Sequence, residues 1–227
     1  LIPILYQPDM VRAKLELRKT QTRRLLKHES AETAINFVYD IVEDLFFPMD
    51  SYGNVLWDKP VKDKYGNPGD ILWTRENYTQ NGLEYYRYKA DWGNGKYPTG
   101  EPEGTFIGKS VPEKFRGKWK PSIHMPFEAC RLFDKITAVR IERLHDITQA
   151  DAIAEGIRPL NQSAGHLATY GQLYQDYLST DAPFQDGLKA KESYRSLWIS
   201  INGLDSWNAN PWVWVIEFEP TTKPTKL

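Results

Sequence analysis

Residues 211–219, Pro-Trp-Val-Trp-Val-Ile-Glu-Phe-Glu, restrict the possible folds more than any other stretch of the chain. Their apolar side chains stand at consecutive positions, whereas a strand with one wet face alternates apolar and polar residues. The stretch therefore predicts a strand that is buried on both faces. The 227 residues are long enough to bury a sizeable core, in one large domain or two small ones.

Periodicity predicts the other elements. Short apolar or alternating runs indicate strands at residues 2–6, 20–25, 71–78, 83–92 and 130–144, the first at the edge of a sheet. Apolar stripes and capping residues indicate helices over residues 9–17, 30–47, 148–155 and 188–200. Residues 93–118 show little periodicity and are expected to form a long loop. Because strands and helices alternate irregularly, we expect an α+β domain with a curved or closed mixed sheet.

Composition excludes several classes of protein. Apolar residues make up 41% and charged residues 26% of the chain, as in ordinary soluble globular proteins. The formal net charge of −1 argues against a protein that wraps long nucleic acid, and it favours a small ligand or a single nucleotide. Cys130 is the single cysteine, and the four His have no metal-ligand spacing, so neither a disulfide nor a metal site is expected. With no signal peptide and no long apolar run, we expect a cytoplasmic protein without a membrane span.

Residues 15–24, Leu-Glu-Leu-Arg-Lys-Thr-Gln-Thr-Arg-Arg, concentrate cations and hydroxyl groups at an expected helix-to-strand junction. A lysine beside other cations has a lowered pKa and can accept a proton from a hydroxyl group. If Lys19 activates Thr22 in this way, Thr22 becomes a nucleophile for acyl groups. Arg24 and its cationic neighbours either maintain these surroundings or bind a carboxylate or phosphate. The alternative, a solvated basic face of a strand, is at least as common.

Glu155 is a second candidate, because it closes a short helix just before Gly156. A carboxylate at the C-terminal end of a helix meets the unfavourable end of the helix dipole, and burial there raises its pKa. These conditions suit an acid–base residue. A Glu in this position is nevertheless more often a surface residue.

A third group of candidates lies in two separate segments. Arg75 and Glu76 follow Trp73 in a predicted strand, and they form either a structural ion pair, which is the commoner case, or one wall of a pocket. His124 lies close to Ser122 in a segment whose prolines fix the backbone. It is a candidate ligand contact, although a packed loop His is at least as common.

Residues 17–24 resemble the signature of the ASCH domain, a family of the PUA-like superfamily. That signature, Gly-x-Lys-x-x-Glu-x-Arg, lies between a first helix and a strand. Lys19 and Arg24 match it, whereas Leu17 replaces the Gly and Thr22 replaces the Glu. The variant with Thr is similar to that of small bacterial amidohydrolases that act on N4-acetylcytidine. In those enzymes a distant Glu completes the site, in a segment Leu-Thr-Glu-x-x-Ala-x-x-Glu that is similar to residues 147–155.

Other blocks resemble the ASCH proteins of phages and prophages. They are Pro-Gly-Asp-Ile-Leu-Trp-Thr-Arg-Glu at 68–76, Trp-Lys-Pro-Ser-Ile-His-Met-Pro at 119–126, Asp-Ala-Ile-Ala-Glu-Gly at 151–156 and Asn-Pro-Trp-Val-Trp-Val-Ile-Glu-Phe at 210–218. The resemblance leaves insertions near residues 27–62, 93–116 and 158–187. It implies a single domain over residues 1–220, with a tail at 221–227.

The resemblance implies a PUA-like mixed β-barrel flanked by helices, and an amidohydrolase that needs no cofactor. Lys19 would deprotonate Thr22, Thr22 would attack the acyl carbonyl, and Glu155 would pass a proton to the leaving amine; direct activation of water by Lys19 and Thr22 is the other route. The partner of such an enzyme would be a small nucleoside substrate or RNA. The expected substrate contacts, with Tyr78 as a further stacking candidate, are Arg24, Arg75, Glu76, Trp73, Trp119, Ser122 and His124.

Two other functions are compatible with the same sequence. A PUA-like reader of RNA or modified bases would use the cations without any chemistry, and its affinity would fall steeply with salt. An ASCH ribonuclease would direct the same cations at a phosphodiester. The near-neutral net charge and the Thr in place of Glu favour the amidohydrolase. The acyl group and the oligomeric state remain open at this point.

Overall fold

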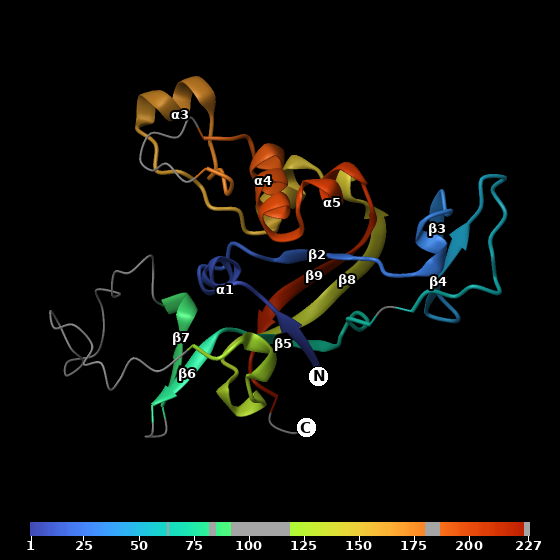
Figure 1. The fold of residues 1–227 in the computed structure, drawn as a ribbon, viewed down its shortest axis with the longest axis horizontal. Coiled ribbons are helices and arrows are strands. Elements are labelled where there is room, and N and C mark those ends of the chain that lie inside the picture. Colours follow the sequence, from blue (N-terminus) through green and yellow to red (C-terminus); the bar gives the residue numbers. More distant parts are fainter. Residues whose placement is uncertain (63, 82–84, 92–118, 180–186, 225–227) are drawn as a thin grey trace, which may run out of the picture.

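The computed structural model describes residues 1–62, 64–81, 85–91, 119–179 and 187–224 (Figure 1). The loop expected over residues 93–118, and with it the insertion near 93–116, lies outside the described residues. The described part is an α+β structure whose main sheet has five strands in the order β1-β5-β8-β9-β2. The strands are β1 (Ile2–Leu5), β5 (Ile71–Arg75), β8 (Phe133–Arg143), β9 (Trp212–Thr221) and β2 (Gln21–Leu25).

The C-terminal strand β9 is the centre of the core, as its sequence predicts. It pairs with β8 along almost its whole length and with β2 on its other side. Val213, Val215 and Ile216 in this strand have no exposed surface, so both faces of β9 are covered. The register between β8 and β9 shifts near Ile136, which indicates a bulge that bends the pair.

The main sheet is mixed, but it is open in the part of the chain that the structure describes. β1 pairs with β5 in parallel and every other neighbouring pair is antiparallel. β1 and β2 form the two edges, so the closed barrel expected from the resemblance is not present among these strands. A side chain connects the two edge strands instead, because Arg24 Nη2 in β2 donates a hydrogen bond to the carbonyl oxygen of Leu5 in β1 at 2.7 Å.

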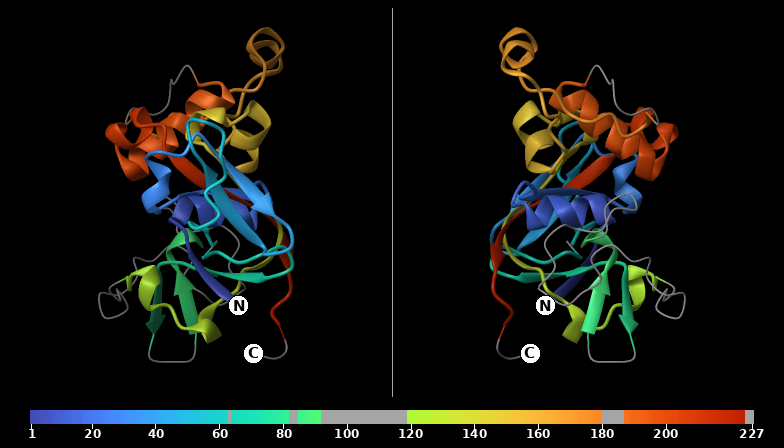
Figure 2. Two further views of the ribbon diagram at one scale, coloured as in Figure 1. Left: turned by 90° about the vertical axis from the view of Figure 1, so that its right-hand side faces the viewer. Right: turned by 90° about the vertical axis from the view of Figure 1, so that its left-hand side faces the viewer.

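Helices cover one end of the sheet (Figure 2). α2 and α5 both contact α4, whose buried face includes Tyr194, Leu197 and Trp198. Ile201 has the spacing that predicts the same buried face, but it is 44% exposed. α2 begins with a complete capping box between Thr148 and Asp151. The helices are α1 (Pro8–Leu15), α2 (Gln149–Ala154), α3 (Ala164–Tyr170), α4 (Ala190–Asn202) and α5 (Leu204–Asn208). The short 3₁₀ helices are η1 (Glu29–Ala31), η2 (Lys89–Asp91), η4 (Ser122–His124), η5 (Phe127–Ala129) and η6 (Leu144–Asp146).

The helix predicted over residues 30–47 is wrong, because this segment forms the hairpin of β3 (Asn36–Asp40) and β4 (Leu45–Met49). Phe37 and Phe46 stand on the two strands. Their rings pack edge-on against Trp212 and Trp214, with ring centres 5.1 and 5.2 Å apart respectively. Ile41, which the helical stripe would bury, is 83% exposed in the turn. Contacts with distant aromatic residues thus override the local helical spacing.

Two other expectations need correction. The strand predicted over residues 71–78 ends at Arg75, and Tyr78 begins a second hairpin of β6 (Tyr78–Asn81) and β7 (Tyr85–Tyr88). In the insertion near residues 158–187, the helical spacing of Tyr170, Leu173, Tyr174 and Tyr177 predicts one continuous stripe. Helix α3 ends at Tyr170 instead, so the later residues lie outside it. Figure 1 shows α3 and the β3–β4 hairpin projecting from the body that contains the main sheet. Among the described residues, no helix is both long and apolar enough to cross a membrane.

Substitution of Gly156 by Ala should destabilise the fold strongly. Gly156 has a φ of +87°, and a Cβ there would lie 2.7 Å from the Cβ of Lys19 and 2.8 Å from that of Ala13. Backbone strain and overpacking together should lower the free energy of unfolding by about 2 to 5 kcal/mol, measured by urea denaturation.

Gly53 provides the matched control, because its φ is +84° but a Cβ there would meet no atom within 4 Å. Gly53→Ala should therefore cost only the backbone strain, about 1 to 2 kcal/mol. Equal losses in the two variants would show that close packing of Gly156 against Lys19 is unimportant.

Candidate functional site

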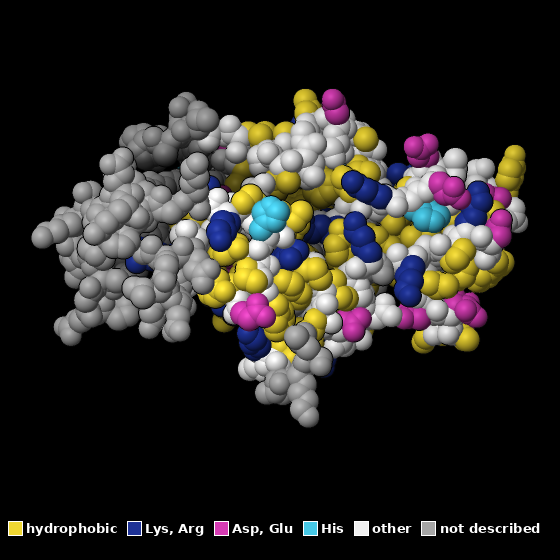
Figure 3. All heavy atoms as spheres, turned by 60° about the horizontal axis from the view of Figure 1, so that its bottom comes forward, with side chains coloured by type: hydrophobic (Ala, Val, Ile, Leu, Met, Phe, Trp, Pro, Cys, Tyr) yellow, Lys and Arg dark blue, Asp and Glu magenta, His cyan; other side chains and the backbone are white. Residues whose placement is uncertain are grey.

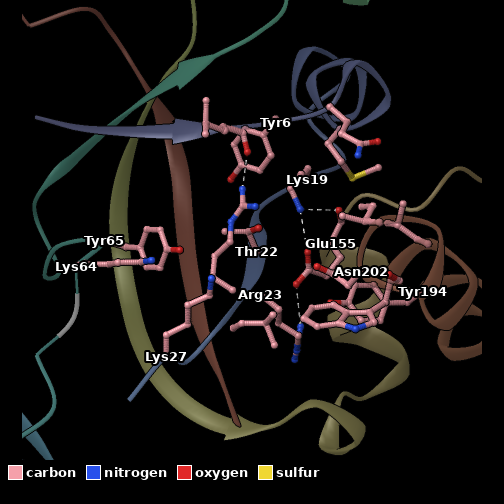
Figure 4. Close-up of a pocket in the computed structure, with 18 residues that line it drawn as sticks. Tyr6, Lys19, Thr22, Arg23, Lys27, Lys64, Tyr65, Glu155, Tyr194 and Asn202 are labelled. Atoms are coloured by element: carbon pink, nitrogen blue, oxygen red, sulfur yellow. Dashed lines mark hydrogen bonds and ion pairs between the residues drawn. The ribbon is translucent and has the colours of Figure 1, made fainter. Parts of the chain in front are cut away.

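A pocket of about 260 Å³ opens beside the junction of α1 and β2 (Figure 4). The end of β1, strand β2, the residue that caps α2 and helix α4 all contribute side chains to its wall. The three predicted catalytic residues, Lys19, Thr22 and Glu155, line it together. A volume near the lower end of the range for ligand sites suits a small molecule.

Backbone hydrogen bonds hold Lys19 against the end of α2. After α1 the chain reverses at Leu17, which has a φ of 56°, and the amide nitrogens of Arg18 and Lys19 both donate to the carbonyl of Ala13. Lys19 then forms an isolated β-bridge with Glu155, the residue that caps the C-terminus of α2. Two residues that are 136 positions apart in the sequence are thereby fixed side by side.

The ammonium group of Lys19 is buried and fully hydrogen-bonded. Its Nζ donates to the carbonyl of Gln21 at 2.7 Å, and to the carbonyl and Oε2 of Glu155 at 2.8 and 2.9 Å. Burial lowers the pKa of Lys19 to about 8, although the Glu155 carboxylate acts in the opposite direction. At a pH near 8, a large fraction of Lys19 is therefore neutral and able to accept a proton.

Glu155 is held between two cations. Its Oε2 accepts from Lys19, and its Oε1 accepts from Nη1 of Arg23 at 3.1 Å. The side chain of Arg23 has no exposed surface, and it also pairs with Glu142 and lies 3.6 Å from Asp151. Each oxygen of the Glu155 carboxylate thus has its own cationic partner, which compensates for the burial of its charge.

Thr22 also lines the pocket, and Figure 4 shows it near Tyr6. Both side chains are buried, with 4% and 6% of their surface exposed. The guanidinium carbon of Arg24 lies 5.1 Å from the centre of the Tyr6 ring. The pocket therefore places a hydroxyl nucleophile candidate opposite a partly neutral lysine and beside two further polar side chains.

The other predicted substrate contacts lie elsewhere. Trp73 packs edge-on against Phe127 in a second, smaller core cluster, and none of Trp73, Arg75, Glu76, Trp119, Ser122 and His124 lines the pocket. Glu76 is buried and pairs with Arg131 at 2.8 Å, so the alternative of an Arg75–Glu76 ion pair is wrong. Burial raises the pKa of Glu76, while Arg131 opposes the shift. Arg75 instead lies over the Trp73 ring and donates to the carbonyl of Met125.

Sequence reasoning missed most of the pocket wall. Tyr194 and Trp198 of α4 appear in the sequence as a helical stripe, but nothing in that stripe tells which strand it covers. Arg23 is visible in the cationic stretch, yet its carboxylate partners are far away in the sequence. The wall residues that were not singled out as ligand contacts include Tyr6, Arg23, Lys27, Lys64, Tyr65, Tyr194, Trp198 and Asn202.

Comparison of the chain with protein-family models, with curated proteins and with solved structures gives no match. Within the described ranges, His, Cys, Asp and Glu side chains form no group of three or more that could hold a metal ion. What the pocket can do must therefore be inferred from its own side chains. These are the buried cluster of Lys19, Glu155 and Arg23, and the hydroxyl group of Thr22.

Removing the Glu155 carboxylate should strongly destabilise the protein. Glu155→Ala leaves the ammonium of Lys19 and the guanidinium of Arg23 buried with fewer compensating charges, so the free energy of unfolding should fall by about 3 to 5 kcal/mol in urea denaturation.

Glu142→Ala is the matched control, because Arg23 then keeps Glu155 and the Glu142 side chain is 17% exposed. Glu142 accepts hydrogen bonds from Arg23 and from Arg140, and because it is partly exposed their loss should cost less, about 1.5 to 3 kcal/mol. A larger loss in Glu142→Ala than in Glu155→Ala would contradict the central position of Glu155.

Proposed function

We propose that this protein is an amidohydrolase that removes the acyl group from N4-acylated cytosine nucleosides such as N4-acetylcytidine. One observation carries the proposal: Lys19 Nζ lies 2.9 Å from Glu155 Oε2 in a pocket that Thr22 also lines. The resemblance to the ASCH signature supports it. So does the φ of 56° at Leu17, because the signature has Gly at this position and glycine adopts such an angle without strain.

In the proposed reaction, neutral Lys19 accepts the hydroxyl proton of Thr22 while Thr22 Oγ1 attacks the acyl carbon. The bond between the acyl carbon and N4 then breaks, and N4 receives a proton from Lys19 through Glu155. Water hydrolyses the resulting ester, with Lys19 accepting a proton from the water and returning one to Thr22. Cytidine and a carboxylate leave, and the hydroxyl group of Thr22 is restored.

The remaining wall residues suit a heterocyclic base. Tyr65 and Trp198 contribute aromatic surface, as does Tyr194, and Asn202 offers both a donor and an acceptor. Stacking on such side chains is sequence-tolerant and strong enough to hold a single base. These residues take over the stacking and edge contacts that the sequence suggested for Trp73, Trp119 and His124.

A non-catalytic reader of RNA or modified bases is the second candidate. On the face drawn in Figure 3, Lys and Arg side chains gather across the middle. Arg24, Lys27 and Lys64 line the pocket, and no carboxylate among the described residues forms an ion pair with them. Phosphate binding would satisfy these cations, but it would not require a buried lysine whose pKa is lowered to about 8.

Hydrolysis of N4-acetylcytidine by the purified protein, followed by chromatography, tests the proposal directly. Lys19→Met and Thr22→Val should each reduce kcat by at least about 100-fold, because each removes a group that takes part in proton transfer or bond formation. Thr20→Val is the matched control, since Thr20 is exposed and absent from the pocket wall. Wild-type hydrolysis by Thr22→Val would rule out Thr22 as the nucleophile, whereas salt-sensitive RNA binding without hydrolysis would favour the reader.

The pH dependence of kcat/KM should report the charge state of Lys19. Because the neutral amine is the active form, log kcat/KM should rise with a slope of one up to about pH 8 and then level off. The Glu155 carboxylate raises the pKa of Lys19, so the residual activity of Glu155→Gln should level off at a lower pH. A rate that falls between pH 6 and 8 would rule out neutral Lys19 as the base.

A further inference from the structure

Two polar atoms on the wall of the pocket are buried and make no hydrogen bond with any described residue. They are Tyr6 Oη and Arg24 Nε. Most buried polar groups in proteins are paired, because an unpaired one has lost its bonds to water without replacement. Among the described residues, only Ser30 and Thr74 also carry side-chain atoms in this state, and neither lines the pocket. Unpaired buried atoms thus coincide with the candidate site.

The surroundings hold the Tyr6 ring in place. Its backbone nitrogen donates to the carbonyl of Arg75 at 3.2 Å, which continues the pairing of β1 with β5. The ring is surrounded by cations, with Lys14 Nζ at 5.0 Å and Lys19 Nζ at 5.5 Å from its centre, in addition to Arg24. Because these contacts restrict the ring, its hydroxyl group stays beside Thr22 at the pocket (Figure 4).

Both unpaired atoms are hydrogen-bond donors. The Nε atom of an arginine carries a hydrogen. Burial raises the pKa of Tyr6 well above its ordinary value, although the charge of Arg24 and the neighbouring Thr22 hydroxyl group oppose the shift. Tyr6 therefore keeps its proton and cannot serve as a base. Two unpaired donors beside a hydroxyl nucleophile fit an acceptor oxygen that carries negative charge, and they do not fit a cation or an apolar group.

We propose that Tyr6 Oη and Arg24 Nε together bind the carbonyl oxygen of the acyl group and stabilise the oxyanion that forms when Thr22 attacks. This inference rests on the proposed function. As the bond between Thr22 Oγ1 and the acyl carbon forms, the electron pair of the carbonyl moves to its oxygen, and both donors keep their protons. The pair returns when the bond to N4 breaks. Tyr6 and Arg24 touch the reacting atoms and are catalytic residues in this scheme.

Tyr6→Phe separates this role from a structural one. The variant should lose about 100- to 1,000-fold in kcat on N4-acetylcytidine, the usual loss for one oxyanion donor, with a much smaller change in KM. It should also unfold at a temperature about 2 to 4 °C higher than the wild type, because Phe removes a buried hydroxyl group that has no partner. Activity and stability should therefore move in opposite directions.

Tyr88→Phe is the matched control. The Tyr88 hydroxyl group is paired, since it donates to the carbonyl of Ala129 at 2.7 Å, and Tyr88 lies outside the pocket wall. This variant should unfold at a lower temperature than the wild type and keep its kcat. If Tyr6→Phe behaves like Tyr88→Phe, the hydroxyl group of Tyr6 has a structural partner and the proposal is overturned. An unchanged kcat in Tyr6→Phe overturns it as well.

Calorimetric binding of N4-acetylcytidine to Thr22→Val, with and without Tyr6→Phe, distinguishes this inference from the proposed function. If the wild type binds N4-acetylcytidine without hydrolysing it, and Tyr6→Phe weakens binding about 5- to 10-fold, the oxygen subsite is supported while the amidohydrolase is not. If hydrolysis occurs and Tyr6→Phe changes neither kcat nor binding, the amidohydrolase stands and the subsite is overturned. Absence of both hydrolysis and binding in the wild type overturns both.

Discussion

The buried cluster of Lys19, Glu155 and Arg23 connects the fold to the site. Its charges come from the start of β2 and from the end of α2, so the cluster can form only after two segments that are 136 positions apart in the sequence have met. Burying three charges costs several kcal/mol per ion, and the cost is met only because both oxygens of Glu155 are paired. The strand β9 makes this possible, since it holds β2 in register from Gln21 to Leu25.

A second buried ion pair lies close to this cluster. Lys14 of α1 pairs with Asp134 of β8, and its Nζ lies 4.6 Å from the ring centre of Phe218 in β9. Lys14 also lowers the pKa of Lys19, as does Arg24. The cations around Tyr6 thus act together on Lys19 through their charge, while Asp134 compensates for the desolvation of Lys14. The same arrangement of buried charges therefore stabilises the fold and lowers the pKa of Lys19.

Features that depend on neighbouring residues could be predicted from the sequence. The capping box of α2 and its termination at Gly156 are local. The alternation of β2 separates Thr22 and Arg24 from Arg23 in the sequence, yet all three residues line the pocket. Features that depend on distant contacts could not. The β3–β4 hairpin depends on Trp212 and Trp214, and the direction of Trp73 depends on its register with Phe133 in β8. The position of Glu155 before Gly156 made it a candidate, but only the resemblance linked it to Lys19, because no local pattern does so.

The hydrogen bonds of Lys19 restrict how the site can work. As an ammonium, Lys19 uses all three of its donors on Gln21 and Glu155, so no donor remains for a substrate. Loss of one proton frees a lone pair and gives up one of these bonds. The bond to Glu155 Oε2 is the one that can adapt, because the two carbonyl bonds are fixed by the β-bridge and by strand β2. Glu155 is then the group that responds directly when Lys19 changes its charge, which is the coupling that a proton relay between a nucleophile and a leaving amine requires.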